Sequence, residues 1–230
     1  MKFCIRVDDL GFLPTDPKKS DDGLALAQRF HEAMQELPYL GAVIPSTVNQ
    51  VGVNWLRSNP EGLTLALHGW NHEKSDGVES EFRNLSGDEC RKRICAGRLW
   101  LLGNQGVIPH FVPPWNALEP NLIEACYHEG IKYIWGEPSN WPTPPQPYAM
   151  GRITFVPSWK PLYAATAWRM STDTPPLSET LLTLLDQPGK AIITLHITWE
   201  AAKCNDFRGM RWLVEKIKDR VISPEEYLAV

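Results

Sequence analysis

The amino-acid sequence predicts an α/β fold in which strands and helices alternate about seven times and close into one (β/α) barrel. Short apolar runs, such as residues 3–7, 63–67 and 191–195, predict strands, and stretches with helical periodicity separate them. Polar side chains follow these runs directly, as they do at the carboxyl ends of strands in parallel α/β folds. Neither an internal repeat nor a long linker divides the 230 residues. We therefore expect a single domain over residues 1–230.

The first third of the chain predicts three strands and two helices. After the first strand, Ser20 caps a helix whose first turn carries Asp21 and Asp22, which are favourable beside a helix N-terminus. The buried stripe of this helix consists of Leu24, Ala27, Phe30, Met34 and Leu37. We then expect a strand, a helix and a strand, in that order, at residues 41–44, 47–57 and 63–67.

The middle of the chain predicts two more helices, two more strands and one unusual segment. Ser86 and Glu89 form a capping-box pattern that opens a helix running to about Leu102. A strand, a helix and a strand follow, at residues 107–112, around 122–126 and at 131–135. The segment from Pro138 to Trp168 is rich in proline and tryptophan and is crossed by a strand at 153–156. Such a segment predicts a lid or binding loop, and the alternative is that its tryptophans fill the outer core.

The last part of the chain predicts one strand between two helices. The first helix covers residues 178–185, and the strongly apolar run at 191–195 predicts a buried strand that ends at His196. The final helix is amphipathic, with an apolar stripe formed by Met210, Leu213, Val214 and Ile217.

Composition and charge exclude several classes of partner. Hydrophobic residues make up 43% of the chain, and the formal net charge is −4 with no basic run. We therefore expect no nucleic-acid and no membrane partner, but a small-molecule or carbohydrate substrate. The sequence leaves the oligomeric state open.

The N-terminus and the cysteines indicate a compartment. The sequence begins with a strand instead of a signal sequence, and its cysteines lack the spacing of metal sites or disulfide frameworks. Reduced thiols are usual in the cytoplasm, so we expect a cytoplasmic protein. The five cysteines are Cys4, Cys90, Cys95, Cys126 and Cys204.

Two short motifs predict a metal site. The strand at 63–67 delivers His68 and His72, four residues apart, and neutral imidazole is the commonest protein ligand for zinc. An open catalytic site needs a third protein ligand, and the pair Asp8-Asp9 follows the first strand. Either motif alone has a simpler explanation, an incidental histidine pair or a turn. Together they indicate a divalent ion, which we expect to be Zn²⁺.

Four motifs in order resemble those of one enzyme superfamily. They are the strand followed by Asp8-Asp9, the His68 and His72 pair, the segment Phe111-Val112-Pro113-Pro114-Trp115-Asn116, and Thr194-Leu195-His196. This set is similar to that of the polysaccharide deacetylases, including carbohydrate esterase family 4. The resemblance implies an irregular seven-stranded (β/α) barrel and a metal-dependent hydrolase that removes an acetyl group from an N-acetylated sugar or similar amide.

The resemblance also implies a role for each site residue. Asp9, His68 and His72 would hold the metal, and the ion would lower the pKa of its bound water toward ~7. Asp8 would be the general base, and His196 the general acid that protonates the leaving amine. The backbone N–H of Trp115 would bind the oxyanion. The expected substrate-binding residues are Arg6, Trp70, Pro114 and Asn116.

One position departs from the family's pattern. The family has arginine where this sequence has Val112, and that arginine pairs with the base aspartate. Arg6 lies two residues before Asp8, on the same face of the strand, and we expect it to supply the missing positive charge.

Two alternatives remain open from the sequence. One is a glycoside hydrolase on a related barrel, using Asp8 with Glu73 or Glu200. The other is a carbohydrate-binding pseudoenzyme, favoured by Val112 and the segment rich in proline and tryptophan. For the enzyme we expect a small acetylated sugar or amine instead of a long polymer, because residues 138–168 are long enough to roof a groove.

Overall fold

The computed structural model describes residues 1–11, 23–103, 106–136, 148–156, 185, 188–197 and 207–229. By their contacts the residues of the chain fall into two compact units. The first consists of Met1–Gly41, Pro60–Thr64 and Trp159–Val230, and the second of Ala42–Asn59 and Leu65–Ser158. The expectation of a single domain therefore remains a prediction.

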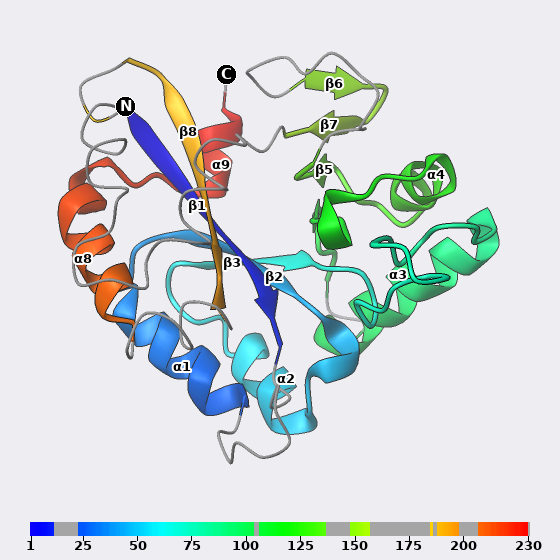
Figure 1. Cartoon of the computed structure of the whole chain (residues 1–230), viewed down its shortest axis with the longest axis horizontal. Helices are drawn as coiled ribbons and strands as arrows, with labels where there is room; N and C mark the ends of the chain where they lie inside the picture. The colour runs from blue at the N-terminus through cyan, green and yellow to red at the C-terminus, as the bar shows by residue number, and fades with distance from the viewer. Residues whose placement is uncertain are drawn as a thin grey trace. The chain divides into compact units, whose positions relative to one another are not determined.

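The first unit is built on two parallel strands, β1 (Lys2–Leu10) and β8 (Lys190–His196), which lie side by side (Figure 1). Their register places Asp8 opposite His196. Residues 3–8 are all buried, as expected for a strand covered on both faces. The strands predicted at 3–7 and 191–195 are therefore confirmed, and each is longer than its apolar run.

Helix α1 (Gly23–Ala33) follows β1 and is shorter than predicted. It ends early because Gln35 and Glu36 have φ values of 54° and 64°, which a right-handed helix cannot accommodate. The predicted stripe is buried in its first four members, and the ring of Phe30 packs edge-on against that of Phe207, with centroids 5.6 Å apart. The predicted cap, Ser20, lies outside the described residues.

The C-terminal helices of the first unit are α8 (Arg208–Ile217), the 3₁₀ turn η3 (Lys218–Arg220) and α9 (Pro224–Leu228). Leu213, Val214 and Ile217 of the predicted stripe are buried. Ser223 forms a full capping box with Glu226, which satisfies two backbone donors where α9 begins. The helix predicted at 178–185 lies almost entirely outside the described residues.

The helices of the second unit are α2 (Gln50–Arg57), α3 (Gly87–Leu102) and α4 (Pro120–His128). The helix predicted at 47–57 is divided, because the 3₁₀ turn η1 (Pro45–Thr47) precedes a new cap at Asn49, whose side chain accepts the Gly52 N–H at 2.8 Å. Ser86 caps α3 as predicted. No helix in the described part of the chain is both long and apolar enough to cross a membrane.

Two strands of the second unit are much shorter than their apolar runs. Strand β4 (His110–Phe111) lies between Pro109 and Pro113, which have no N–H to give to a ladder. Strand β5 (Tyr133–Ile134) starts late because the Ile131 N–H bonds back to the Cys126 carbonyl at the end of α4. The prolines and the helix end therefore decide where these strands begin and end.

Within the described residues the strands form one sheet, in the order β6-β7-β5-β4-β3-β2-β1-β8. Strands β2 (Tyr39–Val43) and β3 (Leu63–Leu67) contribute residues to both units. Strand β4 pairs in parallel with β3 and β5, and β5 with β7 (Ile153–Phe155). The antiparallel strand β6 (Tyr148–Met150) is absent from the sequence prediction. The α/β class is confirmed.

Candidate metal centre and active site

The first unit places a buried ion pair near the carboxyl end of β1. Arg6 is completely buried and donates to both carboxylate oxygens of Asp8, from Nε at 2.7 Å and from Nη2 at 2.6 Å. The side chain of Asp8 is only 3% exposed. Burial penalises a lone carboxylate, and a bidentate guanidinium is the partner that offsets this penalty best. The expected positive charge beside Asp8 therefore comes from its own strand.

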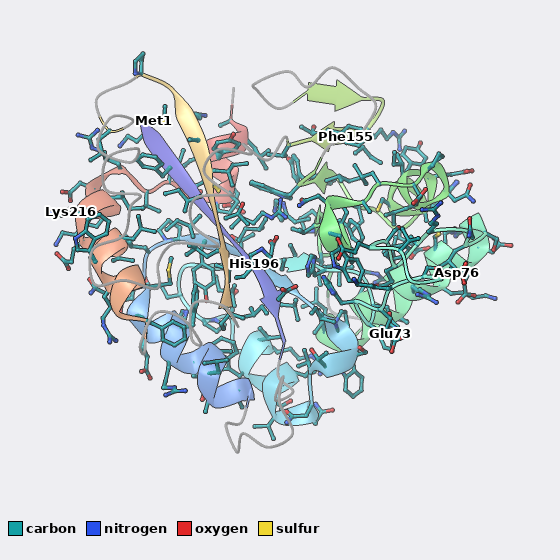
Figure 2. All side chains as sticks on the ribbon, in the orientation of Figure 1. Met1, Glu73, Asp76, Phe155, His196 and Lys216 are labelled. Atoms are coloured by element: carbon teal, nitrogen blue, oxygen red, sulfur yellow. The ribbon has the colours of Figure 1, made fainter. Side chains whose placement is uncertain are left out.

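Asp9 lies next to Asp8 in a different environment. Its φ of 59° interrupts the extended backbone, so the regular alternation that sends adjacent side chains to opposite faces is broken there. Asp9 Oδ2 lies 3.1 Å from Nδ1 of His196, the last residue of β8, and its side chain is 22% exposed. Figure 2 labels His196 where β8 runs beside β1. One aspartate thus faces an arginine and the other a histidine.

The second unit holds both predicted histidine ligands. His68 follows β3 and is buried, and its Nδ1 lies 2.9 Å from the carbonyl oxygen of Val112. The pairing of β3 with β4 brings this carbonyl into reach, since the Val112 N–H bonds to the Leu67 carbonyl. A backbone carbonyl at Nδ1 fixes the tautomer with the proton there and leaves Nε2 as the ligand nitrogen.

His72 and Trp115 lie against each other in the same unit. Their ring centroids are 4.1 Å apart, and those of His68 and His72 are 4.8 Å apart. Trp115 belongs to the 3₁₀ turn η2 (Pro114–Asn116), and both Trp115 and Asn116 have positive φ, 53° and 55°. Among the described residues the Trp115 N–H meets no acceptor, while the next N–H bonds to Pro113. This turn therefore presents one backbone donor beside the histidines.

A carboxylate that sequence reasoning missed supports the histidine turn. Glu81 Oε1 accepts the Trp70 N–H at 2.8 Å, and Oε2 accepts the His72 N–H at 2.9 Å. Burial raises the pKa of the Glu81 carboxyl, although these hydrogen bonds and the charge of Arg93 oppose the rise. A glutamate nine residues beyond a histidine has no recognisable spacing, so no pattern in the sequence could identify it.

Two of the three predicted ligands lie together in the second unit. His68 and His72 have ring centroids 4.8 Å apart and each offers one ligand atom, and Asp9 of the first unit offers a carboxylate oxygen. Two imidazoles with one carboxylate is a donor set of open catalytic zinc sites. The donor types and the carbonyl that orients His68 both fit a divalent ion. These three residues are therefore candidate metal ligands.

Comparison with solved structures identifies the fold. A protein from Mycobacterium smegmatis described as a polysaccharide deacetylase is similar over 99% of this chain and 89% of its own, with 18% identity and a TM-score of 0.66. A family 4 acetyl xylan esterase from Clostridium thermocellum, in complex with cobalt, is similar over 98% and 90%, with 15% identity and a TM-score of 0.57. The chain has the fold of the polysaccharide deacetylases. The fold class predicted from the sequence is thereby confirmed.

Two further similarities bear on the alternatives. A family 4 pseudoenzyme from Bacillus anthracis matches over 99% of this chain and 64% of its own, with 14% identity and a TM-score of 0.56. A 4-alpha-glucanotransferase from Thermococcus litoralis matches with 14% identity and a TM-score of 0.64, but the chain spans only 38% of that protein. No protein-family model and no curated protein matches the sequence.

The remaining predicted residues of the deacetylase-type site lie in the second unit. Trp70 is half-buried in the histidine turn, and its carbonyl accepts the Ser46 N–H at 2.9 Å. Pro114 is buried and Asn116 half-buried in η2. Of the two carboxylates considered for glycoside hydrolysis, Glu73 is exposed and accepts from the Asn71 amide at 2.7 Å (labelled in Figure 2). Glu200 lies outside the described residues.

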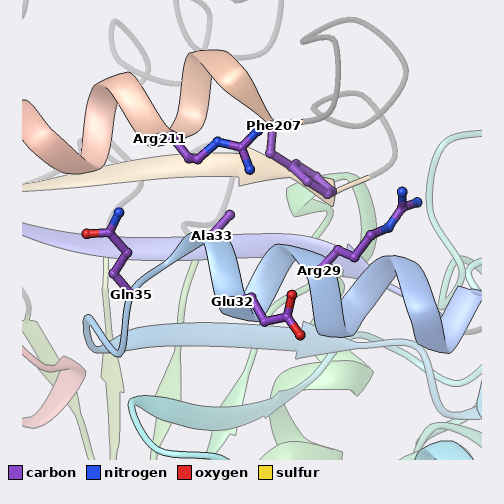
Figure 3. A pocket seen from close by; sticks show the side chains of 6 residues that line it. All are labelled: Arg29, Glu32, Ala33, Gln35, Phe207 and Arg211. Atoms are coloured by element: carbon purple, nitrogen blue, oxygen red, sulfur yellow. The ribbon is translucent and has the colours of Figure 1, made fainter.

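A separate pocket of about 210 Å³ opens on the surface of the first unit. Figure 3 shows the side chains that line it, from α1, the turn after it and the beginning of α8. They are Arg29, Glu32, Ala33, Gln35, Phe207 and Arg211. None of the residues predicted for the deacetylase-type site lines this pocket, so the pocket contributes nothing to that chemistry.

Proposed function

We propose that this protein is a metal-dependent hydrolase that removes the acetyl group from an N-acetylated sugar or a similar amide. The observation that carries this proposal is the pair of His68 and His72, with ring centroids 4.8 Å apart, in a chain with the polysaccharide deacetylase fold; Asp9 is the proposed third ligand. A zinc ion held there would lower the pKa of a coordinated water and polarise the acyl carbonyl.

The two aspartates have different tasks in this proposal. Asp8 takes the proton of the attacking water, and the bidentate contact with Arg6 holds its carboxylate in one orientation. Asp9 is a metal ligand. Its Oδ2 also contacts His196, which is the general acid in this proposal. A fixed carboxylate loses little entropy when it accepts the proton, which is why positioning contributes to the rate.

In this proposal His196 protonates the leaving group, and Trp115 stabilises the negative charge that develops on the acyl oxygen. When His196 is protonated, its Nδ1–H can donate to Asp9, and Nε2–H can be given to the leaving nitrogen. The Trp115 N–H donates to the acyl oxygen as that oxygen becomes negative, a contribution of about 3 kcal/mol in comparable sites. The positive φ of Trp115 is the local strain that turns this N–H out of the regular hydrogen-bond pattern.

Acetate release under metal control tests the proposal. The zinc-loaded protein is incubated with acetylated monosaccharides, nucleotide sugars and oligosaccharides, and free acetate is followed. We expect release with at least one short substrate, its loss after exhaustive chelation, and its return when zinc is added. His72→Ala is the matched control, and it should be inactive under all three conditions. Acetate release that survives chelation would contradict the proposal.

The pseudoenzyme alternative has one specific observation in its favour. The position where the family has an arginine is occupied here by Val112, which is fully buried. The buried contact between Arg6 and Asp8 weighs against this alternative, since it supplies the charge partner from β1. A pseudoenzyme would bind an acetylated sugar, measurable by calorimetry, without turnover under zinc, cobalt or manganese.

The remaining parts of the proposal concern the size of the substrate, the cellular location, the number of domains and the partners. We propose a small acetylated sugar or amine, a cytoplasmic location and a single domain, as the sequence indicated, with no nucleic-acid or membrane partner. The segment at 138–168, on which the substrate size rests, lies mostly outside the described residues. Turnover of long oligosaccharides alone would contradict the proposed substrate size.

A further inference from the structure

A single buried carboxylate organises the turn that carries the second histidine. The turn from His68 to His72 follows β3 and lies outside every helix and strand of the described residues. Two of its backbone N–H groups, those of Trp70 and His72, donate to the two oxygens of Glu81 at 2.8 and 2.9 Å. The side chain of Glu81 is completely shielded from solvent. The Glu81 carboxylate therefore accepts the backbone hydrogen bonds that a helix or strand would otherwise provide for these two N–H groups.

Glycine at position 69 makes this arrangement possible. Its φ is 69°, a value that favours glycine. A Cβ at this position would overlap Glu81 Oε2 and would come within 2.7 Å of Pro114 Cγ. The carboxylate thus lies directly against the backbone of the turn, and no larger residue than glycine fits between the two histidines at this point.

The backbone conformation of His72 is unfavourable, so the hydrogen bond that it makes to Glu81 is important. His72 has a φ of 53°, which costs a residue with a side chain about 1–3 kcal/mol unless neighbouring contacts hold it. The hydrogen bond from its N–H to Glu81 is charge-assisted, which makes it roughly twice as strong as a neutral one. Arg93 Nη1 lies 3.5 Å from Glu81 Oε1, so an arginine partly offsets the buried charge.

We propose that Glu81 is a positioning residue for metal binding, which fixes the backbone of His72 and so aims its imidazole at the ion. The inference rests on the proposed function, because it assigns His72 to the metal site. Glu81 does not touch the ion in this proposal. Outer partners of metal ligands typically change metal affinity by about 10- to 100-fold when they are removed.

The first part of the test is done without metal. Hydrogen exchange of the Trp70 and His72 amides is measured in metal-free wild type, Glu81→Gln and Glu81→Ala. We expect both amides to be protected in wild type and to lose protection in Glu81→Ala. Glu81→Gln keeps one acceptor oxygen and should retain protection at one amide only. Wild-type-like exchange of both amides in Glu81→Ala would overturn the proposal.

The second part measures zinc affinity by competition with a chelator, and the cobalt absorption spectrum as a signature of coordination geometry. We expect Glu81→Ala to bind zinc about 10- to 100-fold more weakly than wild type, with an altered cobalt spectrum. Glu81→Gln should lie between the two. Glu79→Ala is the matched control, because Glu79 lies on the same loop, is exposed, and pairs only with Lys74 among the described residues.

The outcomes separate this inference from the proposed function. Unchanged zinc affinity and cobalt spectrum in Glu81→Gln, together with lost binding in His72→Ala, would overturn the role of Glu81 and leave the metal site intact. Wild-type protein that binds no zinc would overturn the proposed function, and the role of Glu81 with it. If Glu81→Ala does not fold, as judged by circular dichroism, Glu81→Gln alone decides between these results.

Discussion

Two adjacent aspartates show how much surroundings decide the role of a side chain. Asp8 is buried and bound at both oxygens by Arg6, while Asp9 is more exposed and contacts His196. A carboxylate engaged at both oxygens by a guanidinium has little freedom left for an ion. We therefore propose that Asp8 is the base and Asp9 the ligand.

Exchange of each aspartate for asparagine tests this division. Asp8→Asn should keep stoichiometric zinc, because the ligands are untouched, and should lose a factor of about 10²–10⁴ in kcat as expected for removal of a general base. Asp9→Asn should lose both zinc and activity. Metal content by elemental analysis and acetate release are measured on the same samples. The opposite pattern would show that the two roles are exchanged.

Removal of Arg6 tests the energy of the buried ion pair. Arg6→Ala leaves the Asp8 charge buried without its bidentate partner, so we expect a loss of about 3–5 kcal/mol in the free energy of unfolding. Urea denaturation measures this loss. The double variant Arg6→Ala with Asp8→Ala removes both charges and should lose less than the sum of the two single variants. Strictly additive losses would mean that the pair contributes nothing.

Some residues of the site are predictable from sequence and others are not. Asp9, His68 and His72 have a recognisable order and spacing in the sequence, and the structure places the rings of the two histidines close together. Glu81 has no such pattern, because its partners are backbone N–H groups, which every sequence has. Its contact depends on the path of a loop, and short-range periodicity contains no information about that path.

At the scale of elements, helix and strand identity follows from apolar periodicity, but their ends follow from individual residues. Ser86 caps α3 and is visible in the sequence. The early end of α1 at two residues with positive φ is not visible, because glutamine and glutamate are good helix formers. Similarly, β4 is cut to two residues by the prolines on either side, although its apolar run is longer.

The cysteines of α3 and α4 give a prediction at this scale. Burial raises the pKa of Cys90 to about 11 and that of Cys126 also well above its usual value. Both thiols are shielded, whereas Cys95 on α3 is half-exposed. Iodoacetamide at pH 8 should therefore alkylate Cys95 much faster than Cys90 or Cys126 in the native protein. Peptide mass spectrometry measures the order, and equal rates would show that α3 and α4 open readily.

At the scale of the whole molecule, the sheet, which is parallel except at β6, contains strands that are far apart in the sequence. The general α/β class follows from the alternation of elements, and it is confirmed by the similar solved structures. The division into two compact units is not visible in the sequence, because it runs through the middle of β2 and β3 and not through a linker. No composition change marks such a boundary.

Metal binding should stabilise the whole chain if its ligands come from distant segments. An ion that binds only the folded state stabilises it by about 4 kcal/mol at a free concentration of 1,000 Kd. We therefore expect zinc to raise the Tm of wild type and chelation to lower it. Differential scanning calorimetry measures both shifts. In His72→Ala the Tm should not respond to zinc, and an equal response there would place the ion elsewhere.

The pairing of Arg6 with Asp8 means that a buried carboxylate and the cation that neutralises it lie on the same strand, β1. Because the two residues are neighbours on one face of β1, Asp8 and its counterion are encoded together on a stretch of three residues. No arginine is needed after β4 for this purpose. The side chain of Val112 is buried in the core instead, and its carbonyl orients His68. Exchange of Val112 for another apolar residue would thus leave Asp8 and its counterion unchanged.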